Sequence, residues 1–181
     1  MRHCPGLSAA LIMPARLNTA ALIEEMGRGL PRLPGGRVDY SHAKRVPVLV
    51  CFVEYGGRLL LLKRSARVRS YPGKWGAVAG IIDRALPIEE LALAELKREL
   101  GIGPQEVASL TLGEPHEYHD ATLGRSWRLY PMLARLAGTP RIEIDWEHSD
   151  FEWITPERLA DYDTVPLLEE SLRRALRAAL A

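Results

Sequence analysis

The sequence predicts an α/β (α+β) fold, in which helices pack on the faces of one mixed β-sheet. Runs of apolar residues that suit strands alternate irregularly with amphipathic helical segments, without the steady βαβ order of a parallel sheet. Glycine turns join neighbouring strands, which indicates antiparallel pairing. The chain has 181 residues, of which 47% are hydrophobic, so it suits one ordinary domain with a substantial core.

The composition argues against two kinds of partner. Lys and Arg total 24 against 23 Asp and Glu, so binding of bulk nucleic acid through a large basic excess is not expected. The apolar runs fall well short of a bilayer span, so no membrane partner is expected. Cys4 and Cys51 are too few for a disulfide framework, which favours a cytoplasmic location. A signal peptide is disfavoured, and either Met1 or Met13 remains open as the start.

Two regions are predicted along the chain. Residues 1–44 are expected to form an N-terminal arm, followed by the regular domain at residues 45–181. Within the arm, residues 18–28 predict a short helix with Asn18 or Thr19 as its cap. The proline- and glycine-rich stretch that follows this helix predicts a linker.

The domain begins with a predicted hairpin. Val46 to Glu54 is a buried apolar run, Tyr55-Gly56-Gly57 is a typical turn, and Arg58 to Arg64 is the return strand. Further extended segments are expected at residues 75–82, 108–113, 114–120, 126–136, 141–145 and 151–154.

Two longer helices are predicted in the domain. Residues 87–100 have Pro87 at the expected first helical position, glutamates in the first turn, and Gly101 as a stop. Residues 165–179 carry a stripe of leucine and alanine that predicts an amphipathic terminal helix. Between them, Thr155 is expected to cap a short helix.

A pair of glutamates on the helix at residues 87–100 is the first candidate for chemistry. Glu95 and Glu99 lie one turn apart on the same helix face. Two carboxylates there repel each other unless a cation lies between them, and carboxylate oxygens suit Mg²⁺ or Mn²⁺. The same spacing is also common on solvated faces, where Lys97 and Arg98 would screen the pair.

Glycines precede this helix at positions 73, 76 and 80, and they permit a tight loop and close approach of a ligand to the backbone. The order of strand, glycine-rich loop, acidic helix and glycine stop resembles the Nudix hydrolase family. Its signature is G-x5-E-x7-R-E-U-x-E-E-x-G-U, where U is a bulky aliphatic residue. With Gly80 on the first glycine, the following positions match without a gap: Glu95, Leu96, Glu99, Gly101 and Ile102.

The signature is incomplete in this chain. Leu86 stands where the family has its first Glu, Ala94 where it has Arg, and Arg98 where it has the first Glu of a pair. Two interpretations therefore stay open: an enzyme with a reduced metal site, or a catalytically inactive Nudix-like module that binds a ligand or protein. Metal bound near Glu95 and Glu99 would favour the enzyme. Arg98 filling that space in an ion pair would favour the module.

The resemblance implies an α/β/α sandwich with a mixed central sheet. It also implies divalent-metal-dependent hydrolysis of a nucleoside diphosphate linked to another moiety, with Mg²⁺ or Mn²⁺ as the cofactor. Glu95 and Glu99 would be metal ligands and catalytic residues, and Gly80 would belong to the same metal site. Glu147 lies about six residues before Trp153, where several relatives carry a catalytic base, although an ordinary solvated acidic loop would have the same sequence.

Substrate recognition is predicted from three residues. Arg64 and Lys74 are expected to bind phosphates, and Tyr118 lies where relatives that act on dinucleoside polyphosphates often have a tyrosine. The expected partner is a small pyrophosphate compound, and the resemblance allows a homodimer. An isopentenyl-diphosphate isomerase is a further alternative with the same fold. It would need a catalytic cysteine in the pocket, whereas Cys51 is predicted to lie in a core strand.

Overall fold

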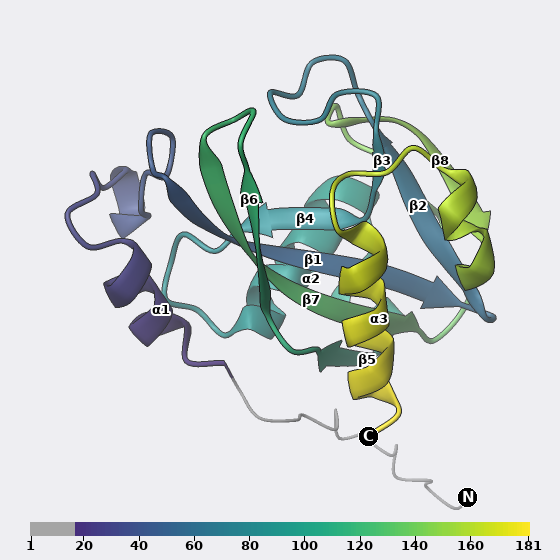
Figure 1. Cartoon of the computed structure of the whole chain (residues 1–181). Helices are drawn as coiled ribbons and strands as arrows, with labels where there is room; N and C mark the ends of the chain where they lie inside the picture. Colours follow the sequence, from purple (N-terminus) through teal and green to yellow (C-terminus); the bar gives the residue numbers. More distant parts are fainter. Residues whose placement is uncertain (1–16) are drawn as a thin grey trace, which may run out of the picture.

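The centre of the sheet is a parallel pair of long strands, β1 (Arg45–Tyr55) and β7 (Arg125–Leu136). The structure, a computed structural model, describes residues 17–181 (Figure 1). Side chains of β1 point alternately into two hydrophobic clusters, with Cys51 in one and Phe52 in the other. A strand covered on both faces needs a nearly continuous apolar sequence, which is what the predicted run provides.

The remaining strands extend this pair into one mixed sheet of eight strands. The hairpin partner of β1 is antiparallel and is reached through glycines 56 and 57, which have positive φ angles of 58° and 76°. Farther from that turn, β1 also pairs with β4 (Val78–Ile81). Strand β7 pairs with β5 (Val107–Leu112) and with β6 (His116–Asp120), and all three pairings are antiparallel. The other bounds are β2 Arg58–Arg64, β3 Trp75–Gly76 and β8 His148–Ile154.

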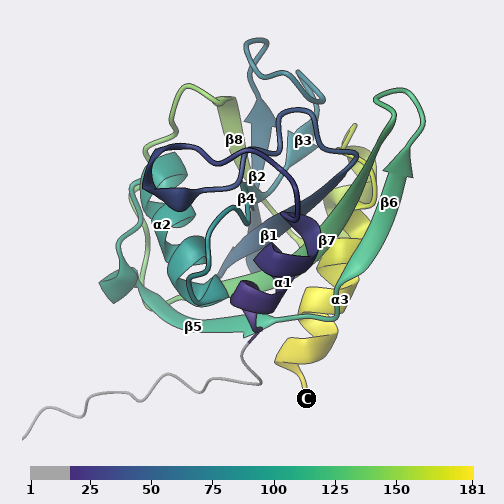
Figure 2. The ribbon, with the colours of Figure 1, turned by 90° about the vertical axis from the view of Figure 1, so that its left-hand side faces the viewer.

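Helices cover both faces of the sheet, which confirms the predicted sandwich (Figures 1 and 2). One cluster joins the sheet to α1 (Thr19–Met26) and α2 (Ile88–Leu100), and the other joins it to α3 (Leu168–Ala179). In Figure 2 the sheet lies between α2 and α3. Short 3₁₀ helices complete the chain at Pro34–Gly36, Pro104–Glu106 and Pro156–Asp161.

Several element ends differ from the sequence prediction for local reasons. Pro87 is the residue before α2 rather than its first residue, because its ψ of 135° is extended. The terminal helix begins at Leu168, three residues later than expected, since Leu167 has a left-handed φ of 57°. Thr155 precedes its short helix but makes no side-chain cap. Gly101 ends α2 as predicted, with φ 75°.

The described part of the N-terminal arm packs onto the same core as the domain. Asn18 caps α1 by accepting a hydrogen bond from the Ala21 N–H at 3.1 Å, as predicted. Leu22 and Ile23 of α1 are buried in the cluster that also holds α2. Cys4 and the choice between Met1 and Met13 as the start lie outside the described residues. Within residues 17–181, no helix is long and apolar enough to span a bilayer.

Close packing of β5 against α3 leads to a stability prediction. A Cβ atom added to Gly113 would lie 2.7 Å from the backbone oxygen of Arg174, and helix backbone cannot move aside cheaply. We expect Gly113→Ala to lower the free energy of unfolding by about 1–3 kcal/mol, the usual cost of overpacking. Gly138→Ala is the matched control, because nothing lies within 4 Å of its added Cβ. Urea denaturation followed by circular dichroism compares the two, and equal midpoints would contradict the prediction.

Candidate active site

Helix α2 and strand β4 approach each other closely at Gly80. A Cβ atom at this position would lie 2.7 Å from both Cγ and Cδ of Glu95. Glycine is therefore favoured here by the space that the Glu95 side chain takes, and not by backbone conformation, because its φ is not in the left-handed region. The side chain of Glu95 therefore packs directly against the backbone of β4.

Arg98 is the centre of a cluster of four carboxylates. Its Nε and Nη2 donate to Glu95 at 2.9 and 2.6 Å, and Nη2 also donates to Glu99 at 3.0 Å. Its Nη1 donates to Asp145 at 2.9 Å and to Glu147 at 2.5 Å. A guanidinium has five N–H groups, so all five have a carboxylate acceptor. We call these five residues the Arg98 cluster.

A loop far along the chain brings the last two carboxylates to α2. The backbone N–H of Glu143 donates to the Leu100 carbonyl at 2.9 Å, and that of Asp145 donates to the Glu99 carbonyl at 3.1 Å. These bonds satisfy carbonyls at the end of α2. They also explain why residues 141–145 form no strand, in contrast to the extended segment predicted there.

Glu99 is the most buried member of the Arg98 cluster, with 1% of its side chain exposed. Burial raises the pKa of the Glu99 carboxyl well above its ordinary value, and the charge of Arg98 opposes this effect. His148 packs beside it, with Nε2 3.6 Å from Glu99 and Nδ1 3.2 Å from Asp145. Burial lowers the pKa of His148, which favours a neutral imidazole at pH 7.

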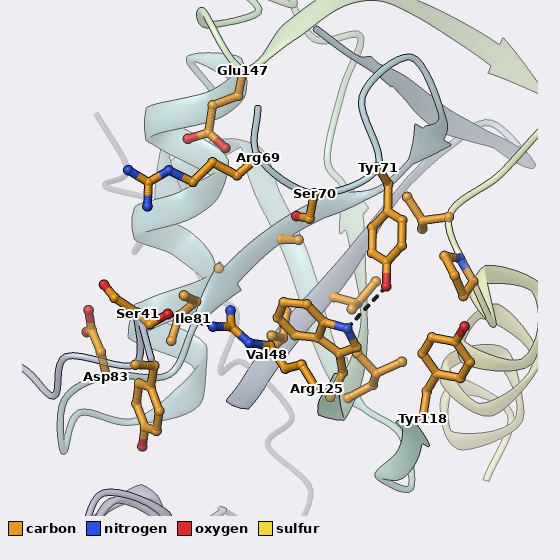
Figure 3. A pocket seen from close by; sticks show the side chains of 18 of the residues that line it. Ser41, Val48, Arg69, Ser70, Tyr71, Ile81, Asp83, Tyr118, Arg125 and Glu147 are labelled. Atoms are coloured by element: carbon orange, nitrogen blue, oxygen red, sulfur yellow. Dashed lines mark hydrogen bonds between the residues drawn. The ribbon is translucent and has the colours of Figure 1, made fainter. Parts of the chain in front are cut away.

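A pocket of about 520 Å³ opens beside the Arg98 cluster (Figure 3). Residues 33–41, the loop at 64–71, and strands β1, β4 and β7 contribute to its walls. Glu147 and Arg69 lie near one another at one end in Figure 3. Gly80 also lines the pocket, as does Glu147, so the glycine loop, the acidic cluster and the pocket form one continuous site.

Aromatic side chains are held rigidly within this pocket. The indole N–H of Trp127 donates to the Tyr71 hydroxyl at 3.1 Å, and that hydroxyl donates to Asp120 at 2.6 Å (Figure 3). The guanidinium of Arg125 lies over the Trp127 ring, 5.5 Å from its centroid. Tyr118 faces the same space from the neighbouring strand β6. Flat rings and guanidinium groups are the surfaces on which nucleotide bases and phosphates bind.

The predicted site residues fall into three groups in the structure. Glu95, Glu99 and Glu147 meet in the Arg98 cluster, beside Gly80. Arg64 and Tyr118 line the adjacent pocket. Lys74 instead forms an ion pair with Asp163 at 2.5 Å and is not part of the pocket wall.

The sequence analysis selected Glu147 from the acidic loop rather than Asp145 or His148, and it did not select Trp127. Asp145 and His148 belong to the same acidic segment as Glu147, so that segment was the available signal. Trp127 had only its residue type as a signal, and tryptophans pack in cores by default. Cys51 is fully buried, and burial raises the pKa of its thiol to about 12, which removes the support for an isomerase-like cysteine.

Comparison with known proteins identifies the family. A family model of the NUDIX domain matches residues 43–176. The chain belongs to the Nudix hydrolase family. It is 27% identical over 125 residues to nucleoside triphosphatase NudI of Escherichia fergusonii, covering 66% of this chain and 89% of that protein. It is 26% identical over 139 residues to the protein of the same name from Escherichia coli, covering 74% and 96%.

Solved structures with the same fold support this assignment. The MutT NUDIX hydrolase from Burkholderia pseudomallei superposes with a TM-score of 0.58 at 24% identity, covering 72% of this chain and 97% of that one. The MutT protein from Methanosarcina mazei gives a TM-score of 0.62 at 17% identity, covering 77% and 99%. Both likenesses establish the Nudix fold. With the family match, they confirm the expectation of a Nudix-type pyrophosphohydrolase.

Nudix hydrolases use divalent metal ions, and the Arg98 cluster contains the oxygen ligands such ions prefer. The side chains as arranged do not fit one. Among residues 17–181, no three Asp, Glu, His or Cys side chains are placed to hold a common ion. The guanidinium of Arg98 stands between the carboxylates that would otherwise converge.

The close approach at Gly80 leads to a prediction for this Nudix site. We expect Gly80→Ala to push the Glu95 carboxylate away from Arg98, because the added methyl group would overlap it. The Nε–H resonance of Arg98 in a ¹H–¹⁵N spectrum would then lose its downfield shift and its protection from exchange with water. Gly76→Ala is the control, since its added Cβ has only ordinary contacts at 3.8 Å. An unchanged Arg98 resonance in Gly80→Ala would count against the close contact.

Proposed function

We propose that the protein hydrolyses the pyrophosphate bond of a nucleoside diphosphate linked to another moiety. Membership of the Nudix family and the likeness to nucleoside triphosphatase NudI support this proposal. The main observation in its support is that the acidic residues and the aromatic residues line the same pocket. One pocket runs from Gly80 and Glu147, at the acidic cluster, to the aromatic rings of Trp127 and Tyr118.

The pocket has the size and chemistry that such a substrate needs. Small-molecule sites typically enclose about 300–1,000 Å³, and this one encloses about 520 Å³. We assign Arg64 and Arg69, at the end near Glu147, to the phosphates. The Nε of Arg64 donates to the Ser70 carbonyl at 2.9 Å, which fixes the direction of its guanidinium. The aromatic end suits a nucleobase, because every base offers a flat face for stacking.

The reaction requires a water molecule to attack phosphorus. A new P–O bond forms to the water oxygen, the bridging P–O bond breaks, and the water proton passes to a carboxylate. We assign the proton to the Arg98 cluster, with Glu147 as the carboxylate that also lines the pocket. A divalent ion would neutralise phosphate charge when bound, and Mg²⁺ or Mn²⁺ is the proposed cofactor, but the arrangement around Arg98 supports no step through it.

A second candidate function is a catalytically inactive module that binds a nucleotide-like ligand. The specific observation in its favour is that Arg98 fills the space between the two signature glutamates, as the sequence analysis expected for such a module. Both candidates use the same pocket and a small-molecule partner. A homodimer and a cytoplasmic location remain predictions in either case.

The decisive test is turnover of a panel of pyrophosphate compounds. The panel holds nucleoside triphosphates, ADP-ribose, other nucleotide sugars, dinucleoside polyphosphates, NADH and coenzyme A, each with Mg²⁺, Mn²⁺ or EDTA. We expect release of phosphate or a nucleoside monophosphate from at least one compound. Glu147→Gln should reduce that rate by about 100-fold, because a carboxylate that handles a proton typically contributes this much. Glu99→Gln should reduce the rate as well, because Glu99 belongs to the same Arg98 cluster.

If the folded wild-type protein hydrolyses no compound of the panel, the result would contradict the hydrolase and support the binding module. Equal rates in wild type and Glu99→Gln would remove Glu99 from the mechanism. Circular dichroism of the variant is the control for folding, since its amide replaces a carboxyl of nearly the same shape.

The two residues predicted to bind phosphates, Arg64 and Lys74, have different surroundings in the structure, and a kinetic experiment can distinguish their roles. We expect Arg64→Gln to raise KM about tenfold or more, because its guanidinium lines the pocket and a charge-assisted contact is worth about 1.5–3 kcal/mol. Lys74→Gln removes the same charge outside the pocket wall, where the ammonium is engaged by Asp163, so KM should change less than twofold. Steady-state kinetics on the best substrate measures both, and a larger effect at Lys74 would reverse the assignment.

A further inference from the structure

The Arg98 cluster holds four carboxylates around a single guanidinium. Within the described residues, Arg98 is the one arginine that forms ion pairs with these four side chains. The other basic group in contact is His148, whose pKa is lowered by burial. With every carboxyl ionised, one positive charge would face four negative ones. The cluster therefore depends on this guanidinium for its compensation.

A guanidinium and a divalent ion require different arrangements of the same oxygens. Mg²⁺ needs oxygens at about 2.0–2.1 Å around one point. Arg98 instead spreads its acceptors along the rim of a planar fork, at 2.5–3.0 Å from three different nitrogens. Oxygens placed this way surround the guanidinium and leave no common centre for an ion, in agreement with the absence of a three-ligand group among residues 17–181.

We propose that Arg98 is the resident cation of this cluster and that, in the substrate-free protein, its guanidinium excludes a divalent ion from the carboxylates of Glu95, Glu99 and Glu147. It does so both by occupying the space and by supplying the charge. This side chain stands where the family signature has a glutamate, so a cation takes the place of an oxygen donor that could bind the ion. The proposal concerns metal binding alone and does not depend on the proposed hydrolysis.

The test is Mn²⁺ binding to Arg98→Gln and to the wild-type protein, without substrate. Electron paramagnetic resonance of free Mn²⁺ gives the bound fraction, and calorimetry gives the Kd. We expect the wild-type protein to show no saturable binding up to millimolar Mn²⁺. Arg98→Gln frees the four carboxylates from the guanidinium, and we expect it to bind Mn²⁺ at least tenfold more tightly than wild type.

Thermal unfolding provides a second test of the proposal, because loss of Arg98 should lower stability while it improves Mn²⁺ binding. In EDTA, Arg98→Gln should have a Tm about 5 °C or more below wild type, because the carboxylates then repel one another without a cation. Mn²⁺ should recover most of this loss in Arg98→Gln and leave the wild-type Tm unchanged. The double variant Arg98→Gln/Glu99→Gln should recover less, since it lacks a carboxylate of the cluster.

The control is Lys97→Gln, which removes the same charge from the next residue of α2. Lys97 donates to the Gly101 carbonyl at 3.1 Å and forms no ion pair with the described carboxylates of the cluster, so Mn²⁺ binding should stay as weak as in wild type. Arg98→Lys keeps the charge and provides a folded comparison if Arg98→Gln is unstable, and it too should bind Mn²⁺ weakly.

Three results would overturn the proposal. The first is saturable micromolar Mn²⁺ binding by the wild-type protein, a measurement that needs no variant. The second is a folded Arg98→Gln that binds Mn²⁺ no better than wild type. The third is an equal gain in Lys97→Gln, which would show a general charge effect. A failure of hydrolysis across the substrate panel would leave each of these measurements intact.

Discussion

The parallel pairing of β1 with β7 is the constraint on which the rest of the structure depends. It runs from Arg45 beside Ser126 to Glu54 beside Arg135, and both strands are covered on both faces. Every other layer is placed by it. Strand β4 adds to β1 with Gly80 opposite Leu49, and this pairing sets the distance between the glycine and helix α2. The same two strands supply the apolar floor of the pocket, so the site rests on the central pair of the sheet.

The site itself shows how one residue changes the electrostatics that a fold provides. Helix α2 ends where its carbonyls already give a partial negative charge, and the loop at 143–147 adds acidic side chains at that end. Such an arrangement is unfavourable without a cation. The side chain of Arg98 is 44% exposed, so solvent weakens its ion pairs, yet Glu99 is almost fully buried beside it. The positive charge that compensates the buried Glu99 carboxyl therefore comes from the solvent-exposed side of the cluster, where Arg98 lies.

Local sequence patterns were sufficient to predict most of the helices and strands. They were not sufficient to predict which distant segments come into contact. The strand Arg58–Arg64 has its predicted bounds because the Gly56–Gly57 turn and the leucine run both act over a few residues. The parallel partner of β1 lies about eighty residues away, and no local signal specifies it. The contact of Arg98 with Glu95 follows from helical spacing, whereas Asp145 and Glu147 are 47 and 49 residues distant. Helical spacing therefore predicts that Glu95, Arg98 and Glu99 are neighbours, but no local pattern predicts that Asp145 and Glu147 join them.

The pocket also extends beyond the segment that identifies the family. The family match begins at residue 43, but residues 37–41 supply part of the wall. Two contacts hold this segment in place: Arg37 pairs with Asp83 at 2.6 Å, and Arg125 donates to the Ser41 carbonyl at 2.6 Å. The wall is thus tied to residues of the matched domain at both ends, through Asp83 after β4 and Arg125 at the start of β7. Family membership accounts for the acidic helix and the glycine loop, whereas the shape of the pocket also depends on residues before the matched domain.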